Sequence, residues 1–143
     1  MIIHAILQLI ERDPFRFVAP EATVREACEL LVGYRAGALP VIEGGALVGI
    51  ISERDVIARL VVKGLSADTT PVSAIMTANP QTVTAADSLA HAYQTMLDGR
   101  FRHLPVMDGE TVIGVISMRD IPAQYQLMVE RWNEIRRAPE PGQ

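Results

Sequence analysis

Gly49-Ile50-Ile51-Ser52-Glu53-Arg54-Asp55 recurs later in the chain as Gly114-Val115-Ile116-Ser117-Met118-Arg119-Asp120. The two copies lie 65 residues apart (114 − 49), and the offset holds without a gap from residues 18 and 83 to residues 58 and 123. Within this alignment 13 of 41 positions are identical. A repeat of this quality predicts that the chain is built from two copies of one supersecondary unit.

Each copy of the motif has the features of a strand that runs directly into a helix. The apolar run from Ala46 to Ile51 predicts a strand, and Ser52 followed three residues later by Asp55 resembles a capping box. A helix N-terminus here would direct backbone N–H groups at one spot that favours an anion. Arg54 would add a planar charged fork that is suited to phosphate.

A simpler interpretation of the motif is purely structural. Ser52 and Asp55 would then only cap the helix, and Arg54 would be a solvated surface charge. The second copy weighs against this interpretation, because a cap needs Ser and Asp but does not need Arg between them.

Composition restricts the class of protein. The chain has 143 residues, 49% of them hydrophobic, and a net charge of −4, which suits one domain or one domain built from two halves. The lack of a long basic run argues against nucleic acid as a partner. The lack of about 18 consecutive apolar residues argues against a membrane-spanning helix, and no membrane partner is expected. The single Cys28 cannot form an internal disulfide, and the start of the chain has no basic segment of a signal peptide, so a cytoplasmic protein is expected.

Periodicity, caps and turn residues predict the order of the elements. Thr23 and Glu26 form one capping box, and Thr70 is expected to be an N-cap with Pro71 as the first helical residue. The expected helices cover residues 2–13, 24–33, 53–63, 72–76, 88–97 and 124–137, followed by a frayed tail over 138–143. The expected strands cover residues 15–18, 38–42, 46–51, 81–84, 103–107 and 111–116.

The second copy departs from the first at Pro122, which stands where the first copy has Ile57. With Ser117 as the N-cap, Pro122 would be the fifth helical residue, where its ring clashes with the carbonyl four residues earlier. The helix after the second motif is therefore expected to begin late or to bend. The second motif is also expected to present Ser117 and Asp120 differently from the first.

The terminal helix has an apolar side formed by Leu127, Met128, Trp132 and Ile135. Such a helix could lie on a membrane surface. Glu130 dilutes its basic charge, so packing on the body of the protein or on a second subunit is the favoured interpretation.

Each unit reads strand, helix, strand, strand, helix, with Leu-Pro-Val before the hairpin and Gly-x-x-Ser-x-x-Asp after it. This pattern resembles the cystathionine beta-synthase (CBS) domain, and the pair resembles a Bateman module, most similar to small stand-alone bacterial CBS-pair proteins. The resemblance covers residues 13–124. It implies an α/β (α+β) fold of tandem CBS domains, each a small sheet with two helices, related by a pseudo-twofold axis. The expected parts are an N-terminal helix (1–13), a first CBS domain (14–64), a connector (65–77), a second CBS domain (78–124) and a C-terminal helix with tail (125–143).

The resemblance further implies a regulatory sensor that binds an adenosine nucleotide (AMP, ADP, ATP or a related adenosyl ligand such as NAD or S-adenosylmethionine) between the two units. Pro122 weighs against the site that uses the second motif. The family's ligand roles fall on the repeated motif and on the segments before Pro-Val. They give Asp55 and Asp120 for the ribose hydroxyls; Ser52 and Ser117 for the ribose or phosphate; Arg54 and Arg119 for the phosphate; Gly37, Ala38, Arg102 and His103 for the base; and Thr77 and Thr82 as weaker candidates.

Other functions have less support in the sequence. His103 has two open interpretations, a structural histidine or a group that lines the cleft near a phosphate. No nucleophile with a neighbouring base and no metal-ligand spacing is present, so neither an enzyme nor a metal site is expected. The competing hypothesis is a dimeric structural or interaction module with empty or vestigial sites. A homodimer and an unidentified protein target are the expected partners.

Overall fold

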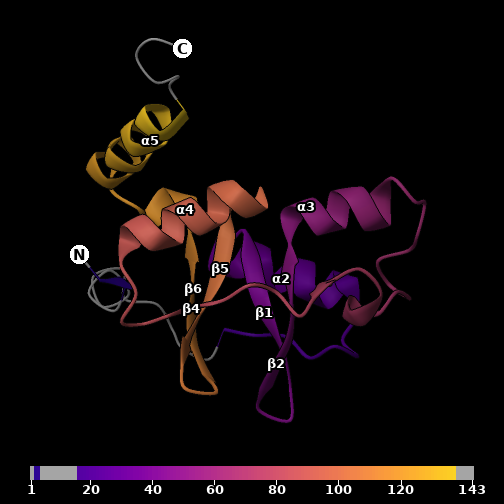
Figure 1. The fold of residues 1–143 in the computed structure, drawn as a ribbon. Coiled ribbons are helices and arrows are strands. Elements are labelled where there is room, and N and C mark those ends of the chain that lie inside the picture. Colours follow the sequence, from indigo (N-terminus) through magenta and orange to yellow (C-terminus); the bar gives the residue numbers. More distant parts are fainter. Residues whose placement is uncertain (1, 4–15, 138–143) are drawn as a thin grey trace.

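The computed structural model describes residues 2–3 and 16–137. Two units of the same design lie beside each other, with their hairpins pointing the same way and helices α3 and α4 at the opposite end (Figure 1). The expected N-terminal helix, apart from Ile2 and Ile3, and the tail at 138–143 lie outside the described residues. The mixed α/β fold of tandem units that the sequence predicts is confirmed.

The first unit is a hairpin covered by helices. A bulge in the hairpin lies between Val41 and Ile42. All strand pairs in this sheet are antiparallel, in the order β1-β2-β3. Its elements are α2 (Val24–Tyr34), β1 (Ala38–Glu43), β2 (Ala46–Ser52), α3 (Glu53–Asp55) continued by the π-helical η1 (Val56–Val61), and, after the connector, β3 (Thr77–Ala78).

The second unit repeats this plan. The parallel pairing of Val83 with Val106 has its counterpart, 65 residues earlier, in an isolated bridge between Val18 and Val41. The sheet order is β4-β5-β6. The elements are β4 (Val83–Thr84), α4 (Leu89–Gly99), β5 (His103–Asp108), β6 (Thr111–Ser117), η3 (Met118–Asp120) and α5 (Ala123–Arg137).

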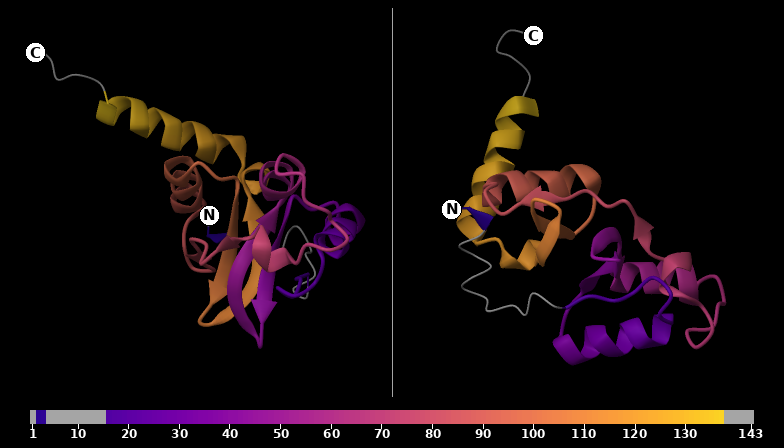
Figure 2. Two further views of the ribbon diagram at one scale, coloured as in Figure 1. Left: turned by 90° about the vertical axis from the view of Figure 1, so that its right-hand side faces the viewer. Right: turned by 90° about the horizontal axis from the view of Figure 1, so that it is seen from below.

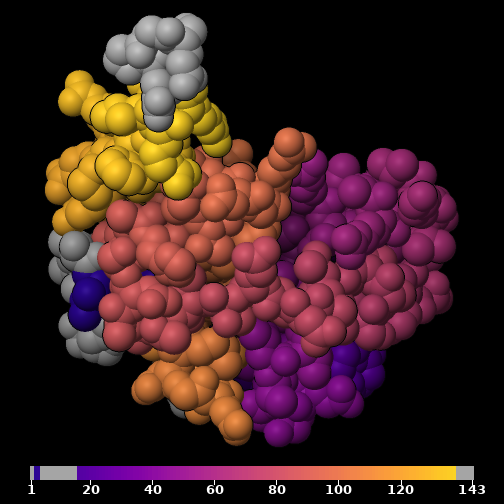
Figure 3. Space-filling view, viewed as in Figure 1, coloured from indigo at the N-terminus to yellow at the C-terminus, as the bar shows by residue number. Residues whose placement is uncertain are grey.

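Each unit has its own core, and a small third cluster joins them. In the first core the capping box at Thr23 aims the apolar stripe of α2 at the hairpin, with Val24 and Ala27 fully buried. The joining cluster consists of Ala38, Ile50 and Val115, which come from β1, β2 and β6. The two sheets therefore meet along their strands, and the units form one continuous body (Figure 3).

The start of the chain packs on the second unit rather than the first. Ile3 is fully buried in the second core, and its N–H donates to the carbonyl of Asp87 at 3.0 Å. Ile2 forms an isolated β-bridge with Ser88. Pro71 of the connector forms the corresponding bridge with Thr23, which lies 65 residues before Ser88. A segment from outside each repeat thus completes the N-terminal end of its first helix.

Two local predictions are wrong. Thr70 is not an N-cap, because its backbone carbonyl accepts a hydrogen bond from Val24 N–H (2.9 Å) and so fastens the connector to the start of α2. Pro71 is extended (φ −73°, ψ 152°), and one 3-10 turn, η2 (Val72–Ala74), follows it. The strand expected over 81–84 is shorter, since only residues 83 and 84 reach the neighbouring strand β5.

Helix α5 projects from the second unit and contacts it along one side only (Figure 2). Val129 is buried on that side, and the Tyr93 hydroxyl on α4 donates to Glu130 Oε1 at 2.7 Å. Burial, helped by this hydrogen bond, raises the pKa of Tyr93 to about 12, so the phenol keeps its proton at neutral pH. The apolar residues 127, 128, 132 and 135 are exposed on the other side, so they do not pack on the body.

Candidate functional site

The first motif forms the predicted capping box. Ser52 Oγ accepts from the N–H of Asp55 (3.2 Å), and Asp55 Oδ2 accepts from Ser52 N–H (3.0 Å) and Ser52 Oγ (3.1 Å). Asp55 Oδ1 accepts from the hydroxyl of Thr77 (3.2 Å), and Arg59 Nε lies 3.9 Å from the same oxygen. Asp55 is only 8% exposed, so both oxygens of its carboxylate are engaged within the protein.

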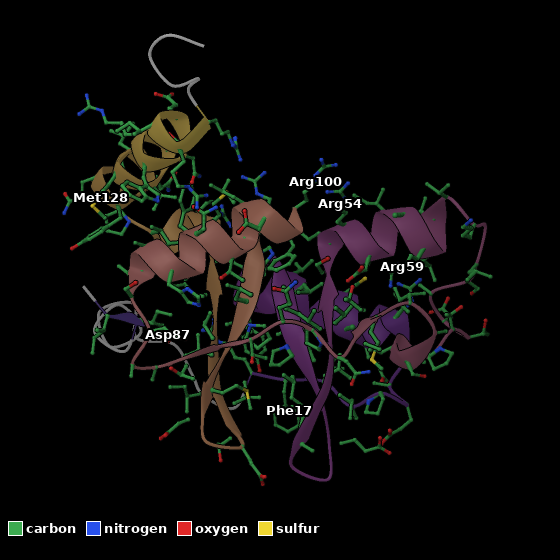
Figure 4. The ribbon with its side chains drawn as sticks, in the orientation of Figure 1. Phe17, Arg54, Arg59, Asp87, Arg100 and Met128 are labelled. Atoms are coloured by element: carbon green, nitrogen blue, oxygen red, sulfur yellow. The ribbon has the colours of Figure 1, made fainter. Side chains whose placement is uncertain are left out.

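Arg59 fixes the connector to the same spot. Its Nη1 donates to the carbonyls of Ile75 (3.2 Å) and Met76 (2.9 Å), immediately before β3 (Figure 4). Asp55, Arg59 and Thr77 thus form one polar cluster that joins the helix after the first motif to the strand that leads into the second unit.

The second motif follows a different path, and the prediction made from Pro122 is confirmed. Residues 118–120 form a single 3-10 turn, Ile121 returns to an extended conformation, and α5 begins only at Ala123. Asp120 Oδ2 accepts from Ser117 N–H at 2.8 Å. The side-chain amide of Gln126 on α5 then donates to the carbonyls of Met118 (3.3 Å) and Ile121 (2.8 Å), on either side of the Arg119-Asp120 pair.

A cavity of about 420 Å³ lies beside this second motif. Its volume falls within the range of small-molecule sites. Residues of both units line it: Arg16, Arg35, Ala36, Gly37, Ala38, Leu39, Pro40, His103, Val112, Gly114, Val115, Ser117, Arg119 and Asp120. The late start of α5 places the turn of residues 118–120 at the edge of this cavity, whereas Asp55 of the first motif contacts Thr77 and Arg59. The expectation that Pro122 weakens a ligand site at the second motif stays a prediction.

The cavity is basic in a protein that is acidic overall. Among the described residues, three arginines (16, 35 and 119) and one carboxylate (Asp120) line it, so these side chains sum to a formal charge of +2 (3 − 1). The guanidinium carbon of Arg16 lies 4.6 Å from the centroid of the Tyr34 ring, a cation–π contact. A site with these groups can hold an anion that also carries hydroxyl groups, which would donate hydrogen bonds to the Asp120 carboxylate.

One wall of the cavity is a contact between the two units. A Cβ built on Gly37 would lie 2.8 Å from His103 Nε2, so the imidazole rests directly against the Cα of this glycine. His103 is half-buried and lines the cavity, which agrees with its interpretation as a cleft residue; any role toward a phosphate stays a prediction.

Of the residues predicted from the sequence, half meet at the cavity. Those that line it are Gly37, Ala38, His103, Ser117, Arg119 and Asp120. Those that do not are Ser52, Asp55 and Thr77, which bond to one another, and Arg54, Arg102 and Thr82, which are exposed. The carbonyl of Arg102 accepts from Met118 N–H (2.8 Å), as the carbonyl of Gly37 accepts from Glu53 N–H (3.0 Å).

Arg16 and Arg35 line the cavity but were not among the residues predicted from the sequence. Arg35 had a signal, because it recurs as Arg100, and both residues end a helix in the left-handed conformation (φ 53° and 58°). Arg100 and Arg54 occupy the corresponding places beside the first motif, at the ends of α4 and α3, and point into solvent (Figure 4). Arg16 had no signal, since its position in the second unit is Gln81.

Residues 2–3 and 16–137 contain neither a metal-binding cluster nor a membrane-spanning helix. No group of three or more His, Cys, Asp or Glu side chains there could hold a metal ion. Within the same residues, no helix combines the length and apolar character needed to cross a bilayer.

Comparison with known proteins gives one consistent result. The CBS domain profile matches residues 8–62 and 72–122. CBS domain-containing protein YhcV of Bacillus subtilis is 33% identical over 104 residues, which are 73% of this chain and 74% of YhcV. CBSCBSPB5 of Arabidopsis thaliana is 34% identical over 128 residues, 86% of this chain but 23% of that protein, so the chain spans less than a quarter of this relative's length.

Among solved structures, the chain is similar to the CBS domain protein PAE2072 from Pyrobaculum aerophilum complexed with AMP. The TM-score is 0.77 at 26% sequence identity, and the match covers 92% of this chain and 99% of PAE2072. A CBS domain structure titled NE2398 gives a TM-score of 0.80 at 27% identity over 89% of this chain and 98% of that chain. With a profile match in each half and the repeated strand–motif–helix plan, the chain belongs to the CBS-domain family and contains two CBS domains in tandem.

Proposed function

We propose that the chain is a regulatory module that binds an adenine nucleotide in the cavity beside the second motif. The observation that carries this proposal is the lining of that cavity by arginines of both units together with Ser117 and Asp120 of the repeated motif. PAE2072, a relative in fold and sequence, is complexed with AMP. The module acts by binding and not by catalysis.

The lining groups suit the parts of a nucleotide. The Asp120 carboxylate, held by the Ser117 N–H, accepts hydrogen bonds from ribose hydroxyls. Arg119 of the second unit and Arg35 of the first take the phosphate. The base lies against the strand start at Gly37 and Ala38, beside the His103 imidazole that packs on Gly37.

Binding in this cavity would affect both the relative orientation of the two units and the position of helix α5. A ligand that contacts both units favours one relative orientation of the two over others, by as much as its affinity differs between them. The turn that carries Arg119 and Asp120 is joined to α5 through Gln126, so a shift of the turn also reaches the exposed terminal helix. A protein target that prefers one state of α5 would read the signal.

The first motif favours a structural role at its own position in the fold. Because Asp55 is saturated by Ser52 and Thr77, this copy is a structural element and binds no nucleotide. The module then carries one ligand per chain. If the second site is also empty in solution, the protein is a structural or interaction module.

Thermal unfolding with AMP, ADP, ATP, NADH and S-adenosylmethionine, each near 1 mM, tests the proposal. A ligand at 100 times its Kd adds about 2.7 kcal/mol to the free energy of unfolding, which raises Tm by roughly 5–10 °C. Cytidine monophosphate is the control for a non-adenine nucleotide. Recovery of intact ligand by chromatography is expected; product formation would show an enzyme, and no shift with any adenosyl ligand would favour the interaction module.

We further propose that α5 pairs with α5 of a second copy. Leu127, Met128, Trp132 and Ile135 are 52–69% exposed and, with Gln124 and Arg131, line a groove of about 560 Å³. The body leaves this side of the helix uncovered (Figure 2). The apolar row is self-complementary, because an antiparallel twofold pairing sets residues 127 and 128 of one helix against 132 and 135 of the other. A relative in fold, a CBS-CP12 protein, is hexameric according to its title.

The double variant Trp132→Glu/Ile135→Glu is expected to convert a dimer into a monomer in light scattering. These side chains make little contact with their own unit, so the fold and Tm of the monomer should change little. Val32→Glu is the matched control, because Val32 is 78% exposed on α2, away from α5. A monomeric parent protein, or binding of the parent protein to lipid vesicles through α5, would contradict the pairing.

A further inference from the structure

Helices α4 and α5 form a second groove between them, of about 600 Å³. It shares no residue with the groove along the apolar row of α5, so pairing of two copies through their apolar rows does not use it. The described residues that line it are Leu97, Asp98, Glu130, Asn133, Glu134 and Arg137.

This groove is acidic. Three of the lining side chains are carboxylates and one is a guanidinium, which sums to a formal charge of −2 (1 − 3) for the described residues. Glu130 and Asp98 each accept a hydrogen bond from a neutral group, the Tyr93 hydroxyl (2.7 Å) and the Gln94 amide (2.9 Å), and these partners do not offset the charge. A cation is therefore the complementary group for this groove.

Asp98 stands at the unfavourable end of its helix. It lies in the last turn of α4, where the helix dipole is negative, and that turn contains no basic residue. Arg100, the C-cap of α4, points into solvent (Figure 4). The carboxylate and the dipole thus repel each other at this end of α4, and a cation bound in the groove would be attracted by both.

Asn133 adds a buried amide to the lining. It is 6% exposed, and within the described residues its side chain makes one hydrogen bond, in which Oδ1 accepts from Arg136 Nη2 at 3.5 Å. A guanidinium only donates, so the amide oxygen takes this contact and the amide N–H groups have no acceptor there. The amide nitrogen is not fully enclosed, because Arg16 Nε is the one fully buried side-chain atom of the described residues without a partner. The groove therefore offers an amide donor beside its carboxylates.

We infer that the groove between α4 and α5 docks a segment of a protein target that carries an arginine or lysine side chain. The cation of that side chain lies between Asp98 of α4 and Glu134 of α5, and its aliphatic stem lies on Leu97. A backbone carbonyl of the same segment accepts from the Asn133 amide. A polyamine would meet the carboxylates but offers no acceptor to this amide, so a polypeptide is the occupant that satisfies the whole lining.

The inference rests on the proposed function in one respect, namely that a protein target reads the position of α5. One wall of the groove, α4, belongs to the core of the second unit. The other wall, α5, is joined through Gln126 to the turn that carries Arg119 and Asp120. A segment that contacts both walls favours one angle between the helices, so its affinity and that of the nucleotide are coupled reciprocally.

NMR titration of the ¹⁵N-labelled full chain with the peptide acetyl-Gly-Leu-Arg-Leu-Gly-amide tests the inference. The amide shifts are expected to centre on residues 97–98 and 130–137. A peptide with citrulline in place of arginine should bind at least fivefold more weakly. Asp98→Asn/Glu134→Gln should weaken the arginine peptide about tenfold, as expected for two exposed ion pairs. Asp108→Asn/Glu110→Gln is the matched control, since it removes two exposed acids at the β5–β6 hairpin, and should change the affinity less than twofold.

Asn133→Leu separates a binding role from a structural one. Leucine fills the buried position without unpaired donors, so peptide affinity should fall about fivefold while Tm stays the same or rises. A lower Tm with unchanged peptide affinity would show that Asn133 only supports the packing of α5, and would overturn its part in docking.

The remaining outcomes distinguish this inference from the proposed function. Equal weakening by both double variants, or spermidine binding as tightly as the peptide, would show general attraction to an acidic protein and overturn the inference. The same holds if the groove residues do not shift, and the thermal shift with a nucleotide then still supports the nucleotide site. If the peptide binds as expected but no nucleotide raises Tm, the docking groove stands and the proposed nucleotide function fails.

Discussion

Asp120→Ala is expected to weaken adenine nucleotide binding about 100-fold, which corresponds to about 2.7 kcal/mol. The carboxylate lines the cavity together with Arg119, and it is the one acidic side chain that the described residues contribute to that lining. Its loss removes charge-assisted hydrogen bonding to the ribose, and one such bond has a net contribution of about 1.5–3 kcal/mol. The affinity is measured by calorimetric titration with the ligand that gives the largest thermal shift.

Asp108→Ala is the control for this variant. Asp108 is exposed at the end of β5, so its removal makes the same change in net charge without touching the cavity. It should leave the affinity within about twofold, as expected for a screened surface charge. Unchanged affinity in Asp120→Ala would show that the ligand, if any, lies elsewhere.

Asp55→Ala is expected to have the opposite profile, with nucleotide affinity retained and the free energy of unfolding lowered by about 2–3 kcal/mol. The substitution removes one half of the capping box and leaves the Ser52 N–H and the Thr77 hydroxyl without their acceptor. For a chain of this length the corresponding fall in Tm is roughly 5–10 °C. Urea denaturation of the ligand-free protein measures the change.

Two companion variants make the assignment of Asp55 specific. Glu53→Ala, an exposed acid in the same first helical turn, should lower stability by less than about 0.5 kcal/mol. A double-mutant cycle of Asp55→Ala with Thr77→Val should give a coupling energy of about 0.5–1.5 kcal/mol, because the two side chains share a hydrogen bond. Loss of nucleotide binding in a well-folded Asp55→Ala protein would refute the structural role and place a ligand at the first motif.

These contrasting expectations arise from two copies of one motif. Both copies carry Ser-x-Arg-Asp, and both aspartates accept the N–H of their serine. The first copy continues into η1, which brings Arg59 back onto Asp55, and the connector supplies Thr77. The second copy is interrupted by Pro122, so no helical turn covers Asp120 and the cavity forms there.

Local chemistry was sufficient to predict most of the fold. The 65-residue offset, the capping boxes at Thr23 and Ser52, and the Gly-containing hairpin turns depend on neighbouring residues, and they predicted the two units and nearly all of their elements. Pro122 likewise predicted the late start of α5, because the clash of its ring is with its own helix. Where a distant partner competed for the backbone, as at Thr70, the local prediction was wrong.

The site was predicted less completely than the fold, because its parts come from segments that are distant in the sequence. The repeated motif was sufficient to predict the family of the fold, and three of its six predicted site residues, Ser117, Arg119 and Asp120, line the cavity. The packing of distant segments brings the connector and η1 onto Asp55, and it places Arg16 and Arg35 of the first unit in one cavity with Asp120 of the second. The physical reason is that a capping box is closed within four residues, whereas the environment of a carboxylate or a guanidinium is set by whichever segments the packing of two sheets brings against it.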